Sequence, residues 1–159
     1  MSALSQAIKD TTKGFLKSYV DASLAKNPQL LSDYLSQDCV RFIGPQSYLQ
    51  SVGAPADFSM NNTEYESHFG KMEFYTFHTH EIHDLTIDTE NLKAAARSDL
   101  TGTFIDGKKL SRTFVWFLDF NDDGTKIIKT YQHNDSEEGR NFQATIRTYK
   151  EAKNQAEVV

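Results

Sequence analysis

The sequence has little of what several common protein classes require. Its 159 residues contain one cysteine, Cys39, so no disulfide can form within a single chain. No apolar run approaches the roughly 20 residues that span a bilayer. Charged residues from Lys9 to Lys17 interrupt the N-terminal stretch, where a signal peptide needs an apolar segment. These absences predict a cytosolic protein without a membrane partner.

Basic residues are also scarce. Lysine and arginine number 17 against 22 aspartate and glutamate residues, which gives a formal net charge of −5, and no lysine- or arginine-rich run occurs. A nucleic-acid partner is therefore not expected. The 12% of aromatic residues can supply an apolar core, and a chain of this length buries roughly 68–70% of its unfolded surface. We expect one domain over residues 1–159, with a flexible tail after about residue 153.

Apolar residues at helical spacing predict three helices in the first half of the chain. They are a first helix with Ile8, Phe15, Leu16 and Tyr19 on one side, a second that begins at Pro28, and a third capped by Asn61 or Asn62. Between the last two, residues 39–43 form a candidate strand. Residues 44–60 are expected to form an irregular lid or binding loop that carries Tyr48.

The second half of the chain alternates between apolar and polar residues with a period of two. Four long strands are expected, at 79–89, 92–105, 110–120 and 126–134. Turn dipeptides such as Asp106-Gly107 and Asp123-Gly124 separate them and favour antiparallel hairpins. A closing helix is expected over about 140–153. Helices followed by an antiparallel meander predict an α+β domain.

One of these strands is apolar on both faces. Residues 114–118 read Phe-Val-Trp-Phe-Leu, so both faces of the sheet should be covered at this point. The helices can cover only one face. The sequence therefore predicts a homodimer through the outer sheet face.

Motifs that could hold a metal ion are incomplete. His78 and His80 are two apart and could grip one metal from one strand face, but the further ligands of a cupin-type site are missing. Residues 119–124 imitate the start of a calcium loop, but Thr130 stands where the bidentate glutamate is needed. Cys39 beside a short apolar strand is typical of a core residue. We expect no metal and no cofactor.

Polar residues in apolar surroundings are the remaining candidates for a site. Arg41 lies between Val40 and Phe42, so it either faces a cavity or reaches solvent from a strand edge, and we favour the cavity. Arg97 and Asp99 share a strand face and form either a surface ion network or part of a site. The candidate substrate-binding residues are Tyr48, Tyr65, Arg97, Thr113, Gln132 and Asn134.

The order and spacing of several short motifs resemble the SnoaL-like proteins of the nuclear-transport-factor-2-like superfamily, above all small fungal isomerases and cyclases of secondary metabolism. The likeness runs from the first helix to about residue 142. The matching segments are Asp38-Cys39-Val40-Arg41, Pro45 with its loop, Asn61-Asn62-Thr63-Glu64-Tyr65 followed by Phe69, Ile82-His83-Asp84-Leu85, the stretch 121–127, and Asp135-Ser136.

The resemblance implies a cone-shaped curved sheet packed on N-terminal helices, a deep pocket inside it, and homodimers through the outer sheet face. It also implies catalysis without a cofactor. Carried over, Arg41 is the pocket arginine, while Tyr65 and His68 are pocket residues of the third helix. Acidic residues of related isomerases align with Thr103 and Gln132, which cannot transfer a proton as a carboxylate does. Asp99 could replace one of these acids, and His80 or His68 the other.

Three functions remain open at this stage. The first is a cofactor-independent isomerase, cyclase or dehydratase for a small polycyclic natural product, with Arg41, His68, Asp99 and His80 as catalytic residues. The second is a carrier or template protein of the same fold that binds the small molecule without acid–base catalysis. The third is a cupin-like metalloenzyme.

Overall fold

The computed structural model of the protein describes residues 1–158. Four α-helices, one 3-10 helix and six strands follow one another along this part of the chain. In order they are α1 (Ala3–Ala25), η1 (Pro28–Ser32), β1 (Leu35–Gly44), α2 (Gln46–Ser51), β2 (Ser59–Met60), α3 (Asn62–Phe69), β3 (Tyr75–Asp88), β4 (Lys93–Phe104), β5 (Lys109–Phe120), β6 (Ile127–Asn134) and α4 (Ser136–Val158).

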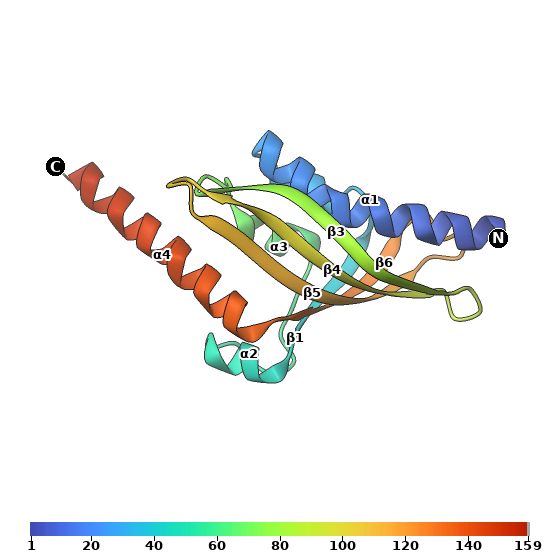
Figure 1. The fold of residues 1–159 in the computed structure, drawn as a ribbon. Helices are drawn as coiled ribbons and strands as arrows, with labels where there is room; N and C mark the ends of the chain where they lie inside the picture. The colour runs from blue at the N-terminus through green and yellow to red at the C-terminus, as the bar shows by residue number, and fades with distance from the viewer. Residues whose placement is uncertain (159) are drawn as a thin grey trace.

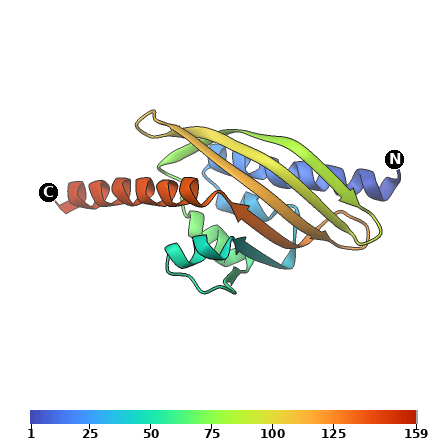
Figure 2. The same cartoon turned by 60° about the horizontal axis from the view of Figure 1, so that its bottom comes forward.

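All six strands belong to one curved, open sheet in the order β2-β1-β6-β5-β4-β3. The strands β3 to β6 form the expected antiparallel meander, and β1 joins its edge parallel to β6. The sheet bends around α1 on one side, while α4 projects beyond it toward the C-terminus (Figures 1 and 2). This is the α+β cone that the sequence predicted.

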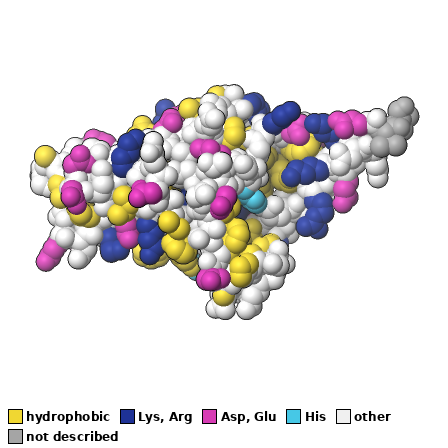
Figure 3. Space-filling model, turned by 180° about the vertical axis from the view of Figure 1, so that it is seen from behind, with side chains coloured by type: hydrophobic (Ala, Val, Ile, Leu, Met, Phe, Trp, Pro, Cys, Tyr) yellow, Lys and Arg dark blue, Asp and Glu magenta, His cyan; other side chains and the backbone are white. Residues whose placement is uncertain are grey.

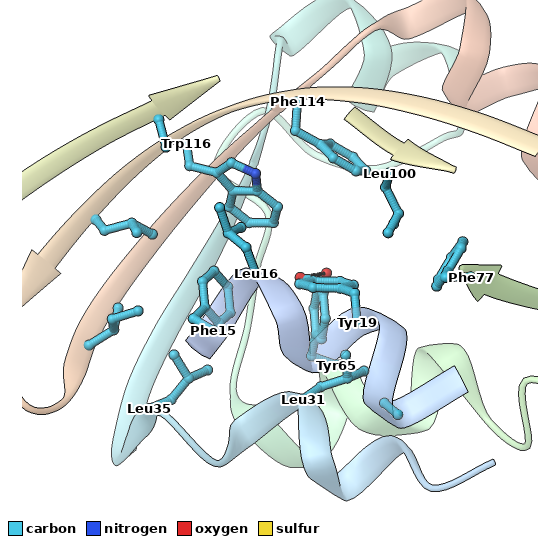
Figure 4. Packing of buried hydrophobic residues seen from close by; sticks show 14 of the residues in the cluster. Phe15, Leu16, Tyr19, Leu31, Leu35, Tyr65, Phe77, Leu100, Phe114 and Trp116 are labelled. Atoms are coloured by element: carbon cyan, nitrogen blue, oxygen red, sulfur yellow. Dashed lines mark hydrogen bonds between the residues drawn. The ribbon is translucent and has the colours of Figure 1, made fainter. Parts of the chain in front are cut away.

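The apolar side of α1 forms the core with the inward face of the sheet. Phe15 and Tyr19 are buried and contact Trp116 of β5, with ring centroids 5.3 and 5.8 Å apart. These rings lie between helix and sheet beside Phe114 and Leu100 (Figure 4). The predicted amphipathic pattern of the first helix is confirmed.

The third helix is also confirmed, together with its cap. The Asn61 side chain accepts a hydrogen bond from the backbone N–H of Glu64, and the Glu64 carboxylate accepts one from the N–H of Asn61. This capping box satisfies two N–H groups that the first helical turn cannot satisfy itself. It fixes the start of α3, and with it the direction of the Tyr65 side chain.

The expected second helix is wrong. Only η1 forms there, and Leu35 opens β1 four residues before the expected start of the strand. Leu31 and Leu35 are both buried, but one comes from a 3-10 turn and the other from a strand, so their spacing imitated a helix. The expected irregular loop also contains the short helix α2, and α4 extends to Val158.

Two register shifts in β3 separate its histidines. The pairing with β4 shifts between Phe77 and Thr79, where His78 lies, and again between Ile82 and Asp84, where His83 lies. Phe77 and His80 therefore both point inward, although they are three residues apart, and His78 bonds the outward-facing Thr103. A bulge places an extra residue on one strand and changes which face the following side chains occupy. The expected common face of His78 and His80 does not exist.

The outer face of the sheet carries apolar side chains that are open to solvent. Phe117 of β5 is 54% exposed and lies beside Tyr131 of β6, and Val40 of β1 is 38% exposed. Within the described residues, no helix has both the length and the apolar character needed to cross a membrane.

Candidate functional site

A cavity of about 430 Å³ opens at the end of the cone where α3, the start of β3, β6 and α4 meet. Its wall combines aromatic rings with polar groups, as expected of a small-molecule site. The polar and aromatic residues of the wall are Tyr48, Tyr65, Ser67, His68, Phe69, Lys71, Glu73, Phe74, Tyr75, Arg112, Gln132, Asn134, Phe142, Gln143 and Lys150. Five of the residues predicted from the sequence thus lie together: Tyr48, Tyr65, His68, Gln132 and Asn134.

A second cavity of about 500 Å³ adjoins the first. Ile43, Tyr48, His68 and Gln143 line both cavities. The remaining wall of the second cavity comes largely from residues 49–60. The side chains that this segment contributes are mostly apolar. The loop that the sequence analysis named as a lid or binding loop therefore forms a wall of this cavity.

A chain of hydrogen bonds runs through the buried wall of the first cavity. The hydroxyl of Tyr19 lies 2.6 Å from that of Tyr65, and Tyr65 donates to Oε1 of Gln132 at 2.9 Å. The amide of Gln132 donates to Oδ1 of Asn134 at 3.0 Å. Because the proton of Tyr65 is directed to Gln132, Tyr19 must donate to Tyr65. Figure 4 shows the hydroxyl groups of Tyr19 and Tyr65 together below the sheet.

Opposing influences act on the acidity of Tyr65. Burial raises the pKa of its phenol, while the guanidinium of Arg41 acts to lower that pKa. Arg112 and the hydrogen bond from Tyr19 also act to lower the pKa. Tyr65 is therefore protonated near neutral pH, and the charges around it stabilise the phenolate that forms if it gives up its proton. Such a group can serve as a proton donor.

Arg41 does not line either cavity. It is 1% exposed and lies beneath the Tyr65 ring, with its guanidinium carbon 3.9 Å from the ring centroid. One of its terminal nitrogens donates to the carbonyl of Leu31 at 2.9 Å and to Ser32 at 3.2 Å. Arg41 is buried, as the sequence predicted. The Tyr65 ring separates its guanidinium from the cavity, so Arg41 can act on a ligand there only through Tyr65.

Arg112 of β5 is the arginine that does line the first cavity, and it is not among the residues predicted from the sequence. It is 7% exposed, and its guanidinium carbon lies 5.1 Å from the centroid of Phe114 and 4.8 Å from that of Phe142. Burial lowers its pKa from the usual value. No hydrogen bond or salt bridge to its guanidinium forms among residues 1–158. Its nitrogens are free to bind a ligand in the cavity.

The signal that could have found Arg112 is the alternation within β5. Every second residue from Leu110 to Phe120 is buried and faces inward, and Arg112 is the one charged residue in that series. The apolar run of residues 114–118 is only part of this inward series, which also includes Arg112 two residues before it. A lone arginine in an apolar period-two series is expected to face a cavity or a partner.

His68 lies at the rim shared by the two cavities and is solvent-exposed. Partial burial against the wall lowers the pKa of its imidazole, and the positive charges of Lys150 and Arg112 lower it further. It is therefore neutral near pH 7 and can accept or donate a proton.

His80 faces inward, but it lies behind the cavity wall. Its Nδ1 is 2.6 Å from the Leu16 carbonyl oxygen and its Nε2 is 2.8 Å from Ser98 Oγ, to which Trp116 also donates. Since a carbonyl can only accept, Nδ1 donates to Leu16 and Nε2 accepts from Ser98. Burial lowers the pKa of His80 to about 4. Both nitrogens are occupied, so this arrangement gives His80 no route to a ligand in the cavity.

Three further candidates point to the outer face. Asp99 accepts a hydrogen bond from His83 at 2.7 Å, and Arg97 pairs with Asp84 at 2.9 Å. Thr113 lies opposite Asp99, and its backbone N–H and hydroxyl donate to Glu138. The surface ion network, which was the alternative interpretation of Arg97 and Asp99, is the arrangement observed.

The residues around the histidines do not form a metal site. No group of three or more histidine, cysteine, aspartate or glutamate side chains with metal-binding geometry occurs among the residues described. Cys39 is fully buried, as expected of a core residue. Burial raises the pKa of its thiol to about 11, so the thiol is protonated at neutral pH. Asp123 and Gly124 form the turn between β5 and β6.

The curved sheet, the helices inside it and the polar cavity at its open end define the fold of the nuclear-transport-factor-2-like, or SnoaL-like, proteins. Solved structures with this fold match the chain, including a nuclear-transport-factor-2-like protein of unknown function from Burkholderia pseudomallei. That match has a TM-score of 0.55 and 13% identity, over 87% of this chain and 95% of that one.

Two fungal proteins match more closely in structure. BvnE pinacolase from Penicillium brevicompactum has a TM-score of 0.74 at 16% identity, over 92% of this chain and 98% of its own. PrhC from Penicillium brasilianum has a TM-score of 0.71 at 13% identity, over 94% of both chains. No family model matches the sequence, and no curated protein sequence matches it. The similarity therefore establishes the fold, as the resemblance in sequence motifs implied.

Proposed function

We propose that the protein is a cofactor-independent isomerase or cyclase that acts on a small polycyclic natural-product intermediate. The observation that carries this proposal is the buried chain from Tyr19 through Tyr65 to Gln132 in the cavity wall. The phenol lies over the Arg41 guanidinium, and when substrate binds its proton turns from Gln132 to an oxygen of the substrate and later returns. Arg112 stabilises negative charge on the same substrate. The fold shared with a fungal pinacolase supports the same class of reaction.

In this mechanism Arg41 is a positioning residue that acts through Tyr65. Its guanidinium under the ring stabilises the phenolate that forms after proton donation. Gln132, which the resemblance in sequence aligns with an acid of related isomerases, here accepts the hydrogen bond that directs the Tyr65 hydroxyl. Tyr48, Asn134 and neutral His68 orient the substrate at the wall. The catalytic carboxylate expected at Asp99 has no part in this mechanism.

The test is Tyr65→Phe, with Tyr131→Phe as the matched control because Tyr131 lies on the outer face and bonds His133. Both variants are incubated with polycyclic precursors that carry carbonyl, epoxide or hydroxyl groups, and the products are separated by chromatography and weighed by mass spectrometry. We expect products of unchanged mass, and a loss of turnover by about 100-fold or more in Tyr65→Phe only. A product lighter by one water identifies a dehydratase. Unchanged turnover in Tyr65→Phe rules out the proposed role of the phenol.

A binding or template protein is the second candidate, and the scarcity of carboxylates in the cavity favours it. Glu73 is the acidic residue of the first cavity wall, and its carboxylate is 2.7 Å from Lys153 Nζ. In a template, substitutions at Tyr65 and His68 change ligand affinity but leave the rate for bound ligand unaltered. The ratio of kcat to KM effects in those two variants separates the two functions.

We also propose that the protein is a cytosolic homodimer whose interface is the outer sheet face around Phe117, Tyr131 and Val40. The exposed apolar side chains on this face support the proposal. Phe117→Asp should yield a monomer in analytical ultracentrifugation, whereas Ile105→Asp, which changes an exposed apolar residue away from this face, should not. A monomeric wild-type protein contradicts the proposal.

A further inference from the structure

The charges around the two cavities differ from those of the protein as a whole. The chain carries a formal net charge of −5, yet Lys71, Arg112 and Lys150 line the first cavity and Arg140 and Arg147 line the second. Seen from behind, lysine and arginine side chains lie among acidic ones toward the C-terminal part of the molecule, beside exposed hydrophobic side chains (Figure 3). The lining of the two cavities is therefore mainly cationic, with Glu73 as its one acidic residue among the residues described.

The acidic groups nearby form no salt bridge with these cations, although the charge of Glu138 acts on Arg112 and opposes the lowering of its pKa by burial. Glu73 is paired with Lys153, and both oxygens of Glu138 accept hydrogen bonds from Thr113. Within residues 1–158, no salt bridge involves Arg112 or any of the four cations at the rim. No side chain of the described residues therefore occupies these cations in an ion pair, and a ligand can form one with them.

Arg112 gives this charge a defined position. Its guanidinium is more than nine-tenths buried, and the rings of Phe114 and Phe142 lie near it without accepting a conventional hydrogen bond. An isolated buried cation is costly, so a partner is expected in the functional state. Arg112 faces the cavity, so the missing partner can be a ligand bound there. A planar guanidinium can donate two parallel hydrogen bonds to the two oxygens of a carboxylate.

The second cavity offers the complementary surface. Leu49, Phe58 and Met60 contribute apolar side chains to its wall, and the shared residues Tyr48 and His68 connect it to the first cavity. A ligand that spans both cavities would have an apolar body in the second and a charged end at Arg112. Lys71, Lys150, Arg140 and Arg147 would attract such a ligand from solution.

We propose that the substrate is an amphipathic organic anion, with a polycyclic apolar body in the second cavity and a carboxylate or enolate oxygen on Arg112. This inference rests on the proposed function, since it names the class of substrate for the same site. The predicted small-molecule substrate is thereby narrowed from any polycyclic compound to an acidic one.

The test compares matched acids and alcohols as probes. Abietate and abietinol share one tricyclic skeleton, and 2-naphthoate and 2-naphthylmethanol share a smaller one. Each is titrated into the wild-type protein by calorimetry at pH 7. We expect the acid to bind at least 10-fold more tightly than its alcohol in at least one pair. Equal affinity, or no binding, in both pairs overturns the proposal.

Two variants locate the preference. Arg112→Met should abolish it, whereas Arg97→Met, which removes a guanidinium from the outer face, should retain it. Loss of the preference in Arg97→Met, or its survival in Arg112→Met, overturns the assignment to Arg112. If Arg112→Met does not fold, as judged by circular dichroism, Arg112→Lys serves instead. It keeps the charge, and it should retain a preference for the acid with weaker affinity because the paired hydrogen bonds are lost.

A separate result reports on the proposed function. Tyr65→Phe should keep the preference for the acid, because the charge at Arg112 is unchanged, while it loses turnover. If the protein prefers the acid but Tyr65→Phe keeps its turnover, the proposed mechanism is contradicted and the proposed substrate class is not. Turnover that depends on Tyr65 without any acid preference contradicts the proposed substrate class alone.

Discussion

Two regions on the inward face of the sheet both contain buried polar side chains, but they differ in how these groups are bonded. In the first, which we call the closed core, His80, Ser98 and Trp116 bond one another and the Leu16 carbonyl. In the second, the cavity, Arg112 has no bonded protein partner among the described residues, and Tyr65 and Asn134 border empty space.

The difference shows how one sheet supports both stability and binding. A buried polar group that is fully bonded contributes modestly to stability, whereas an unbonded one is costly. The closed core follows the first case, and Arg112 in the cavity wall follows the second. Proteins accept such costs at functional sites because a ligand supplies the missing partner. Four changes test this contrast, from the largest expected effect to the smallest.

Acidification should destabilise the closed core through His80. Its pKa is about 4 in the folded protein against 6.5 for an unperturbed histidine, so the unfolded chain binds a proton first as the pH falls. The free energy of unfolding should therefore decrease between about pH 6.5 and pH 4, by about 3 kcal/mol from this group. Urea titrations across this range measure it.

The control for this prediction is His80→Gln, in which the contribution of His80 disappears. The lowered pKa of His68 acts in the same direction and remains in the variant. The pH dependence of the variant should therefore be shallower than that of the wild type, but not flat. Parallel curves for the two proteins would show that His80 is not the neutral buried histidine described above.

Removal of the Ser98 hydroxyl should also destabilise the closed core. Ser98→Ala leaves Trp116 Nε1–H without an acceptor and His80 Nε2 without a donor, both in buried positions. We expect the free energy of unfolding to fall by about 2 kcal/mol. Ser111→Ala on the exposed face of β5 is the matched control and should change it by less than about 0.5 kcal/mol.

The opposite sign is expected in the cavity. Arg112→Met removes a buried charge and keeps most of the side-chain volume, at the loss of the contacts with Phe114 and Phe142. We expect the free energy of unfolding to rise by about 1 kcal/mol while ligand binding is impaired. Loss of stability instead would mean that the protein itself satisfies Arg112, and the contrast between the two regions would fail.

The smallest effect is expected on the outer face. Arg97→Met breaks the pair with Asp84, in which both side chains are more than half exposed. Exposed pairs contribute less than about 1 kcal/mol, and salt screens them. The melting temperature should change little, and the difference from wild type should shrink further in 1 M salt, where the screening length is about 3 Å.

Much of this protein follows from local patterns in its sequence. The helical spacing of Phe15 and Tyr19, the capping sequence at Asn61 and the alternation of residues 92–120 specify α1, α3 and the meander, because each pattern acts over a few neighbouring residues. Tyr65, Gln132 and Asn134, which line the cavity, could be named as candidates from the same patterns and from the resemblance to SnoaL-like proteins.

What only the tertiary structure decided is which polar groups meet. The bulge at His78 turned His80 inward, and the alternation of β4 turned Asp99 outward, so Asp99 pairs with His83 and not with the expected His80 or His68. Arg41 lies under Tyr65, and Arg112 faces the cavity. These positions depend on sheet register and on the contacts of elements distant in sequence. Local spacing does not encode them, because a shift of one residue in the pairing moves a side chain to the other face.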